Sequence, residues 1–304
     1  MRTAFIQELV RQARAHPRLF LMVGDLGYSV VEPFAEEFPD RFLNAGVAEQ
    51  NMTTVAAGLA SEGWHVFTYS IANFPTLRCL EQIRNDVCHH RLPVTVVAVG
   101  AGLAYGNMGY SHHGVQDLAV MRALPGLTLV SPADPGEAAE AVRWLAEHPG
   151  PSYLRLGKAG EKTLHAVRGL HLGPIPVIPP DPGFEEVAIA ATGSVLSVGL
   201  AAARELEALH GRRVPVFSCP WLKPVDEAFF APLWRFGRIV TLEEHVPEGG
   251  FGELLAALKP AGVSMTRLTV THATSGLVGS QEFLRAQSGL TVEAVVRAAA
   301  SHEP

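Results

Sequence analysis

The feature that most constrains the fold is the run Pro-Val-Thr-Val-Val-Ala-Val at residues 93–99. It is almost entirely apolar and rich in β-branched residues, so a strand built from it must be buried on both faces. Such strands belong to parallel sheets that helices cover on both sides. Shorter apolar runs recur at 20–23, 65–69, 127–131 and 153–156, with helical spacing between them. This alternation predicts an α/β fold with a mostly parallel sheet.

The remaining elements follow from the same periodicities. We expect helices at 3–15, about 74–91, 115–123, 134–147, 194–209, 226–234, 250–258 and 291–300, and further strands at 187–191, 214–218, 238–242 and about 265–270. The segment 100–114 is rich in glycine, too long and too polar to be a simple connection.

A proline-rich stretch divides the chain. The segment 171–183 holds five prolines, a composition typical of a stiff, extended linker. We therefore predict a first domain at 1–165, a linker at 166–185 and a smaller α/β domain at 186–304. The total of 304 residues is long enough for two domains with separate cores.

Composition narrows the classes of function. A net charge of −6 gives no basic surface of the kind that binds nucleic acid. Hydrophobic residues make up 48% of the chain, yet no apolar run is long enough to span a membrane, so we expect the excess at subunit interfaces. The three cysteines have no metal-ligand spacing and the chain opens as an amphipathic helix. Both features favour a cytoplasmic protein.

Glu49 is the first candidate for a site residue. A short strand and the tight turn Asn44-Ala45-Gly46 precede it, and a helix of small and apolar residues follows. A glutamate in the first helical turn is most often there because of the helix dipole. This helix is apolar nearly all round, however, so we expect the carboxyl group to be buried. A buried carboxyl is neutral or paired, which suits acid–base chemistry.

Other candidates follow the ends of expected strands, where open α/β sheets bind ligands. His112 and His113 lie in the loop after the central strand, and histidine titrates in the range that suits proton transfer. The alternative for this pair is a polar surface loop. We predict no metal site, because no cysteine or carboxylate stands at ligand spacing. Phe74, at the start of an expected helix, is either a core residue or an aromatic face for a flat ligand. The run Glu243-Glu244-His245 is more typical of packing or an interface than of a nucleotide site.

Three stretches taken together resemble a known family. They are Gly46-Val47-Ala48-Glu49-Gln50-Asn51-Met52, the segment from Phe74 and Arg78 through Glu81-Gln82-Ile83-Arg84-Asn85-Asp86-Val87, and Gly109-Tyr110-Ser111-His112-His113. Their order is similar to that in thiamine-diphosphate-dependent transketolases. The resemblance covers essentially the whole chain and is greatest to the separate C-terminal subunit of a split transketolase. It implies a thiamine-pyrimidine-binding domain followed by a transketolase C-terminal domain.

The resemblance implies roles for the cofactor side of the site. Glu49 is expected to hydrogen-bond a ring nitrogen of the thiamine aminopyrimidine and so to activate the cofactor. Phe74 is expected to stack on the aminopyrimidine, with Arg78 also on the cofactor side. The cofactor then carries a two-carbon unit from a ketose to an aldose.

The resemblance also implies substrate contacts. His112 is expected to contact substrate hydroxyls and assist proton transfer, with His113 beside it. Arg2 and Ser29 match positions that hold a substrate phosphate, although an arginine at a helix start is ordinarily solvated. Arg155 matches a further phosphate-binding arginine, whose planar fork suits that ligand.

Two departures from the full-length pattern qualify these roles. The chain has no Gly-Asp-Gly segment with a distant asparagine to hold the Mg²⁺ that binds the cofactor's diphosphate. We therefore expect an N-terminal partner subunit to supply the diphosphate and Mg²⁺ side, most simply in a heteromer with two copies of each chain. In the substrate loop, Met108 stands where the full-length enzyme has an aspartate, and Val99-Gly100 replaces a His-Ser pair. Whether the sugar substrates are phosphorylated therefore stays open.

Three other functions remain in view. Deoxyxylulose-phosphate synthase has this domain pair, but normally as one continuous chain. The β subunit of a 2-oxo-acid dehydrogenase is a separate chain whose acceptor is a lipoyl group. A non-catalytic subunit that only stabilises or regulates a partner is the third.

Overall fold

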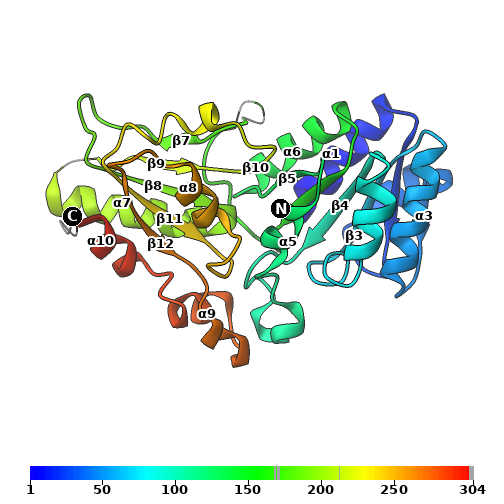
Figure 1. Ribbon diagram of the computed structural model, residues 1–304. Helices are drawn as coiled ribbons and strands as arrows, with labels where there is room; N and C mark the ends of the chain where they lie inside the picture. Colours follow the sequence, from blue (N-terminus) through cyan, green and yellow to red (C-terminus); the bar gives the residue numbers. More distant parts are fainter. Residues whose placement is uncertain (168, 170–171, 212, 301–304) are drawn as a thin grey trace.

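The protein contains two sheets side by side, each flanked by helices (Figure 1). The computed structural model describes residues 1–300 except 168, 170, 171 and 212. The first sheet has the strand order β10-β5-β6-β4-β3-β1-β2 and the second β12-β11-β8-β9-β7. All pairings are parallel except those of β10 with β5 and of β7 with β9. The predicted α/β class with mostly parallel sheets is confirmed.

The strands are short. They are β1 (Leu19–Val23), β2 (Phe42–Asn44), β3 (His65–Ile71), β4 (Val94–Val99), β5 (Thr128–Val130), β6 (Ser152–Leu156), β7 (Ile175–Ile178), β8 (Val187–Thr192), β9 (Val216–Ser218), β10 (Trp221–Lys223), β11 (Arg238–Glu243) and β12 (Ser264–Leu268). The central strand β4 is buried along its whole length, as its composition predicts.

The helices alternate with the strands. The α-helices are α1 (Arg2–Ala15), α2 (Glu32–Glu37), α3 (Glu49–Ser61), α4 (Leu80–Gln82), α5 (Asp117–Ala123), α6 (Pro135–Glu147), α7 (Leu196–His210), α8 (Phe251–Leu258), α9 (Gln281–Gln287) and α10 (Val292–Ala300). A π-helix, η2 (Ile83–Cys88), continues α4, and short 3₁₀ turns are η1 (Pro39–Arg41), η3 (Gly106–Met108), η4 (Tyr110–His112), η5 (Gly193–Val195), η6 (Glu227–Phe230) and η7 (His272–Gly276). None of the helices described is long and apolar enough to cross a bilayer.

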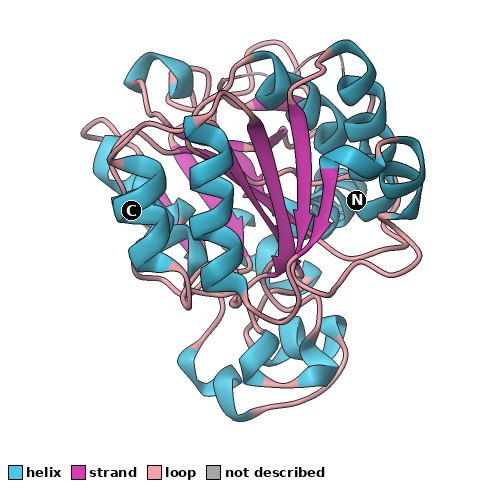
Figure 2. Cartoon of the chain, turned by 90° about the vertical axis from the view of Figure 1, so that its right-hand side faces the viewer, coloured by secondary structure: helices cyan, strands magenta, loops and turns pink. Residues whose placement is uncertain are grey.

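The first sheet is covered on both faces (Figure 2). Side chains alternate along β1, so that Leu21 packs with α1 and α6 while Met22 packs with α3 and η2. In the second sheet α7 and α10 pack together and both contact β8, whereas α8 contacts β11 and β12. Parallel strands buried on both faces require this helical covering, because neither face can be left to water.

Two expected helices are wrong in extent. The helix expected at 74–91 begins only at Leu80, and residues 73–79 form turns. Pro75 disfavours helical geometry at Phe74, so no helix begins at that residue. The helix expected at 226–234 is reduced to the single turn η6, since Pro232 interrupts it.

The proline-rich stretch is more than a linker. Its residues 175–178 form β7, an edge strand that pairs with β9, and sheet edges are where prolines are tolerated. Residues 168, 170 and 171 of the expected linker lie outside the described residues. The two sheets are also connected by β10, which follows β9 in the chain yet pairs with β5 of the first sheet.

Candidate active site

Glu49 is the first residue of α3 and comes directly after the turn that follows β2. Gly46 takes a left-handed conformation in this turn (φ 72°), which redirects the chain into the helix. Glu49 is 2% exposed, so the predicted burial is confirmed. The expectation of an apolar helix all round is wrong, because Gln50 and Thr54 are exposed on the outer side of α3. Burial of Glu49 comes from the inner side, which faces the sheet.

The Glu49 carboxylate has one strong partner. Arg78 Nη1 lies 2.7 Å from Glu49 Oε2, and the Arg78 side chain is 47% exposed. The other oxygen, Oε1, accepts only a long hydrogen bond of 3.5 Å from Ser70 Oγ on β3. Arg78 itself is held from α3, because Gln50 donates to the Arg78 carbonyl at 3.1 Å. Glu49 Oε1 therefore retains most of its hydrogen-bonding capacity.

Arg78 connects Glu49 to two rings. Its guanidinium lies 4.8 Å from the centre of the Phe74 ring, within cation–π range. The Phe74 ring meets the His112 ring edge to face at 5.3 Å between centroids. The structure thus brings together Glu49, Arg78, Phe74 and His112 from three segments that follow β2, β3 and β4. Their meeting follows from the parallel sheet, whose strands all end at the same edge.

His112 and His113 differ in environment. Burial, with a smaller contribution from His113, lowers the pKa of His112, so its imidazole is neutral near pH 7. His112 Nδ1 lies 2.9 Å from Ser111 Oγ, which leaves Nε2 available. His113 is buried, and its Nε2 lies 3.3 Å from the Gly106 carbonyl. Asn73 anchors the loop through hydrogen bonds to the Ser111 and His113 carbonyls at 3.1 and 2.9 Å. His113 supports the loop rather than facing the surface.

Arg2 and Ser29 lie at this edge of the sheet without a contact between them among the described residues. Arg2 starts α1, and its Nη1 lies 3.5 Å from Tyr105 Oη in the loop after β4. Ser29 is exposed, with a left-handed backbone (φ 61°) and an amide that donates to Glu32. Neither residue contacts Glu49.

Arg155 is wrongly predicted to bind a substrate phosphate. It is 1% exposed, and Nε and Nη2 donate to the two carboxylate oxygens of Asp117 at 2.8 and 3.1 Å. Nη2 also donates to the carbonyls of Gly114 and Glu244 at 2.6 and 3.0 Å. Burial opposes charge on Asp117, but pairing with Arg155 outweighs it and lowers the pKa of Asp117. Arg155 is a buried cross-link between β6, the loop after β4 and the second domain.

Sequence reasoning also missed residues of this edge. Ser70 and Asn73 lie at and just beyond the end of β3, where they contact Glu49 and the His112 loop. Lys158 follows the end of β6, and its carbonyl accepts a hydrogen bond from the amino group of Met1. The signal that identifies all three is position, since each lies at or just past the carboxyl end of a parallel strand. Within the described part of the chain, no three His, Cys, Asp or Glu side chains are grouped to hold a metal ion.

Two family models match the chain. The model described as "Transketolase, pyrimidine binding domain" matches residues 1–160, and "Transketolase, C-terminal domain" matches residues 181–295. A solved structure titled "Split gene transketolase, inactive beta4 tetramer" is similar with a TM-score of 0.85 and 32% identity, over 98% of this chain and 96% of that one.

Similar curated proteins include separate chains and parts of longer ones. The "Putative transketolase C-terminal section" of Methanocaldococcus jannaschii is 34% identical over 84% of this chain and 80% of that protein. One of the subunits of an apulose-4-phosphate transketolase from Actinobacillus succinogenes is 31% identical over 89% of this chain and 88% of that protein. The "1-deoxy-D-xylulose-5-phosphate synthase 1" of Geobacter sulfurreducens is 37% identical over 87% of this chain, but the match spans only 42% of the synthase.

Proposed function

Because the chain belongs to the transketolase family, we propose that it is the C-terminal subunit of a split transketolase. In this proposal a separate N-terminal subunit completes the active site, and the assembly transfers a two-carbon unit from a ketose to an aldose. Relatives that are themselves separate chains support it, since the chain spans 88% of the apulose-4-phosphate transketolase subunit and 96% of the split-gene chain. The inactivity of that split-gene chain as a β4 tetramer supports the need for a partner.

The observation that carries the proposal is the half-used carboxylate of Glu49. Its buried position and the weakly engaged Oε1 fit a ring N–H that donates a hydrogen bond, as the imino form of an aminopyrimidine has. The half-buried ring of Phe74 offers a flat face nearby. Thiamine diphosphate, when bound, supplies the carbon nucleophile that carries the two-carbon unit. Arg78 donates to Oε2 of Glu49 and so orients the carboxyl group.

His112 is proposed as the proton carrier on the substrate side. Its lowered pKa keeps the ring neutral, so Nε2 is able to accept a proton from a sugar hydroxyl near pH 7. Ser111 orients the ring through Nδ1, and Asn73 holds the loop that carries it. An orienting partner on the second ring nitrogen is what a general base of this type requires.

Substrate phosphates, where present, are proposed to bind near Arg2. Ser29 lies at the same edge of the sheet and is the further candidate. The diphosphate and Mg²⁺ are proposed to lie on the partner subunit. The assembly proposed is two copies of each chain.

The test is co-expression with a candidate N-terminal subunit, followed by a transfer assay with thiamine diphosphate and Mg²⁺. We expect turnover only with both chains present, and Glu49→Gln to lower it by about 10²–10⁴-fold, the usual range for a positioned acid–base group. The matched control is Glu62→Gln, an exposed glutamate just beyond the other end of α3, which should leave the rate unchanged. Full activity of Glu49→Gln in the assembled complex would instead support a non-catalytic subunit.

A second candidate rests on the identity of 37% to a deoxyxylulose-phosphate synthase. The donor substrate distinguishes a transketolase from such a synthase, and it also distinguishes a transketolase from a 2-oxo-acid dehydrogenase. Turnover of a hydroxylated ketose with an aldose supports transketolase. Turnover only of a 2-oxo acid, with an aldose phosphate or a lipoyl domain as acceptor, would overturn it.

A further inference from the structure

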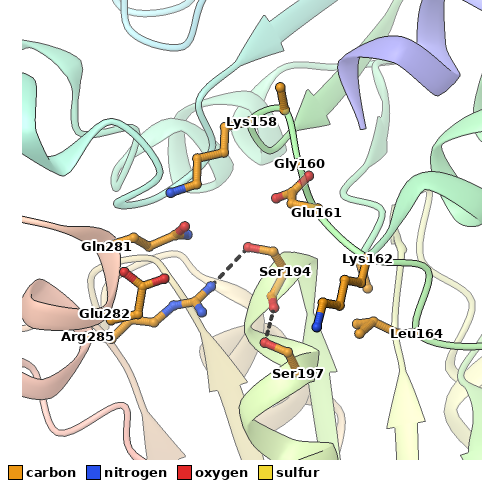
Figure 3. Close-up of a pocket in the computed structure, with 12 residues that line it drawn as sticks. Lys158, Gly160, Glu161, Lys162, Leu164, Ser194, Ser197, Gln281, Glu282 and Arg285 are labelled. Atoms are coloured by element: carbon orange, nitrogen blue, oxygen red, sulfur yellow. Dashed lines mark hydrogen bonds between the residues drawn. The ribbon is translucent and has the colours of Figure 1, made fainter.

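A hollow lies between the two domains, apart from Glu49 and Phe74. It has a volume of about 240 Å³ and is lined from four segments: Ala133 after β5, residues 158–164 after β6, the start of α7, and α9 (Figure 3). These segments are far apart in sequence and come from both domains. A ligand in this hollow would therefore contact both domains.

The hollow is rich in positive charge. Lys158, Lys162 and Arg285 line it, and neither lysine forms an ion pair with a described carboxylate. Two acids oppose them, Glu282 and Glu161. Glu282 is exposed, whereas Glu161 is paired with the amino group of Met1 at 3.1 Å. Arg285 is itself paired with Glu244 at 2.6 Å. With these two pairs set aside, the two lysines face one exposed carboxylate. The balance favours an anion over a cation.

Hydroxyl groups lie among these cations. Ser194 Oγ accepts a hydrogen bond from Arg285 Nη2 at 3.0 Å, and Ser197 Oγ donates to the Ser194 carbonyl at 2.9 Å (Figure 3). Ser197 lies in the first turn of α7 and Ser194 in η5 just before it. The first amides of α7, a helix of 15 residues, point toward this end. Ammonium groups, a guanidinium and hydroxyls together form the donor set that binds phosphate oxygens.

Size limits the ligand. A volume of about 240 Å³ is several times the share of one water molecule, about 30 Å³. It is below the range of about 300–1,000 Å³ typical of sites for drug-sized ligands. Inorganic phosphate or a small phosphorylated sugar fits within this volume.

We propose that this hollow between the domains is a binding site for a small phosphorylated compound, held through its phosphate by Lys158, Lys162, Arg285 and the serines at the start of α7. It is separate from the reaction that Glu49 and His112 are proposed to serve. A series of hydrogen bonds also links the hollow to the His112 loop. Arg285 Nε donates to the Glu244 side chain at 2.6 Å, and the Glu244 carbonyl accepts from Arg155. Arg155 in turn holds the Gly114 carbonyl at the end of that loop.

The test uses the full chain alone, without partner, cofactor or Mg²⁺, so its outcome is independent of the proposed transferase activity. Isothermal titration calorimetry is run with inorganic phosphate, with ribose 5-phosphate and with ribose. We expect the two phosphates to bind, ribose not to bind, and the phosphates to raise the melting temperature of the chain. Tighter binding of ribose 5-phosphate than of inorganic phosphate would identify the ligand as a phosphorylated sugar, and the reverse order as free phosphate.

Variants locate the binding. Lys162→Ala removes an exposed side chain and should weaken phosphate binding at least about tenfold, the effect of one charged hydrogen bond. Ser197→Ala gives a second, independent loss with little risk to folding. Arg204→Ala, which removes one positive charge from the exposed side of α7, is the matched control and should bind like the unaltered chain.

Three results would overturn the proposal. The first is no binding of either phosphate at millimolar concentration. The second is unchanged binding in both Lys162→Ala and Ser197→Ala. The third is loss of binding in Arg2→Ala with Lys162→Ala unaffected, which would assign the anion to the edge of the first sheet instead.

Discussion

The buried pair Arg155–Asp117 provides a sharp test of what fixes β6 to α5 within the first domain and, through the Glu244 carbonyl, to the second domain. Replacing Arg155 with Met keeps an unbranched apolar side chain but removes every donor. Asp117, which is fully buried, then keeps only the 2.8 Å hydrogen bond from Tyr153, and the Glu244 carbonyl loses its bond from Arg155. Removing one partner of a buried pair costs about 3–5 kcal/mol, because the remaining charge stays buried and unpaired.

That free energy converts into a measurable shift. Unfolding entropy of about 2.1 cal/mol/K per residue amounts to roughly 0.6 kcal/mol/K for a chain of this length. We therefore expect Arg155→Met to lower the melting temperature by roughly 5–8 °C in differential scanning calorimetry. The double variant Arg155→Met with Asp117→Asn, which also removes the orphaned charge, should recover part of the loss.

Arg143 supplies the matched control. It pairs with Glu140 and Glu147 along α6, but its side chain is 32% exposed, and exposed pairs contribute only about 0–1 kcal/mol. Arg143→Met should therefore shift melting by less than about 2 °C. Equal shifts for Arg155→Met and Arg143→Met would refute the role of Arg155 as a buried cross-link. So would a double variant no more stable than Arg155→Met alone.

Two further outcomes concern the same region. Gly102→Ala should cost clearly more stability in urea unfolding than Gly211→Ala: both glycines have positive φ, but only at Gly102 would the new Cβ fall 2.3 Å from Glu244 Cβ. Equal losses of stability in the two variants would contradict the clash and show that the loop around Gly102 moves away from Glu244 at no cost. Burial raises the pKa of Glu243 to about 7, above its usual 4.5. The folded state therefore holds the extra proton between these values, so its stability should fall as pH rises from about 4.5 to 7, by at most about 1.4 kcal/mol per pH unit. Glu243→Gln should remove that slope in melting curves, and an unchanged slope would contradict the assignment.

The residues of the candidate active site were largely accessible from the sequence. Glu49, Phe74 and His112 each follow an expected strand, and parallel strands end at one edge, so their meeting required no knowledge of side-chain contacts. Pairing with Arg78 was not accessible in the same way. The sequence predicts a helix from residue 74, and in that helix Arg78 would lie one turn beyond Phe74. The structure has turns there instead, and they place the Arg78 guanidinium against Glu49.

The error at Arg155 has a physical cause. An arginine at the end of a strand looks the same in sequence whether it faces solvent or a buried acid. Tyr153 and Arg155 lie two residues apart on β6 and so point to the same face, where both meet Asp117 from α5. Arg155 and Asp117 are 38 residues apart, so the residues next to either of them in the sequence do not indicate the contact.

By itself the sequence determined the alternation of strands and helices and the edge where the candidate residues gather. These features follow from the spacing of apolar residues along the chain and from the common direction of parallel strands, and both depend on residues that are close in sequence. Only the tertiary structure decided the partner of each charged group and the hollow between the domains. Lys162, Ser197 and Arg285 come from three distant segments, and their shared space exists only once both sheets and their helices have packed.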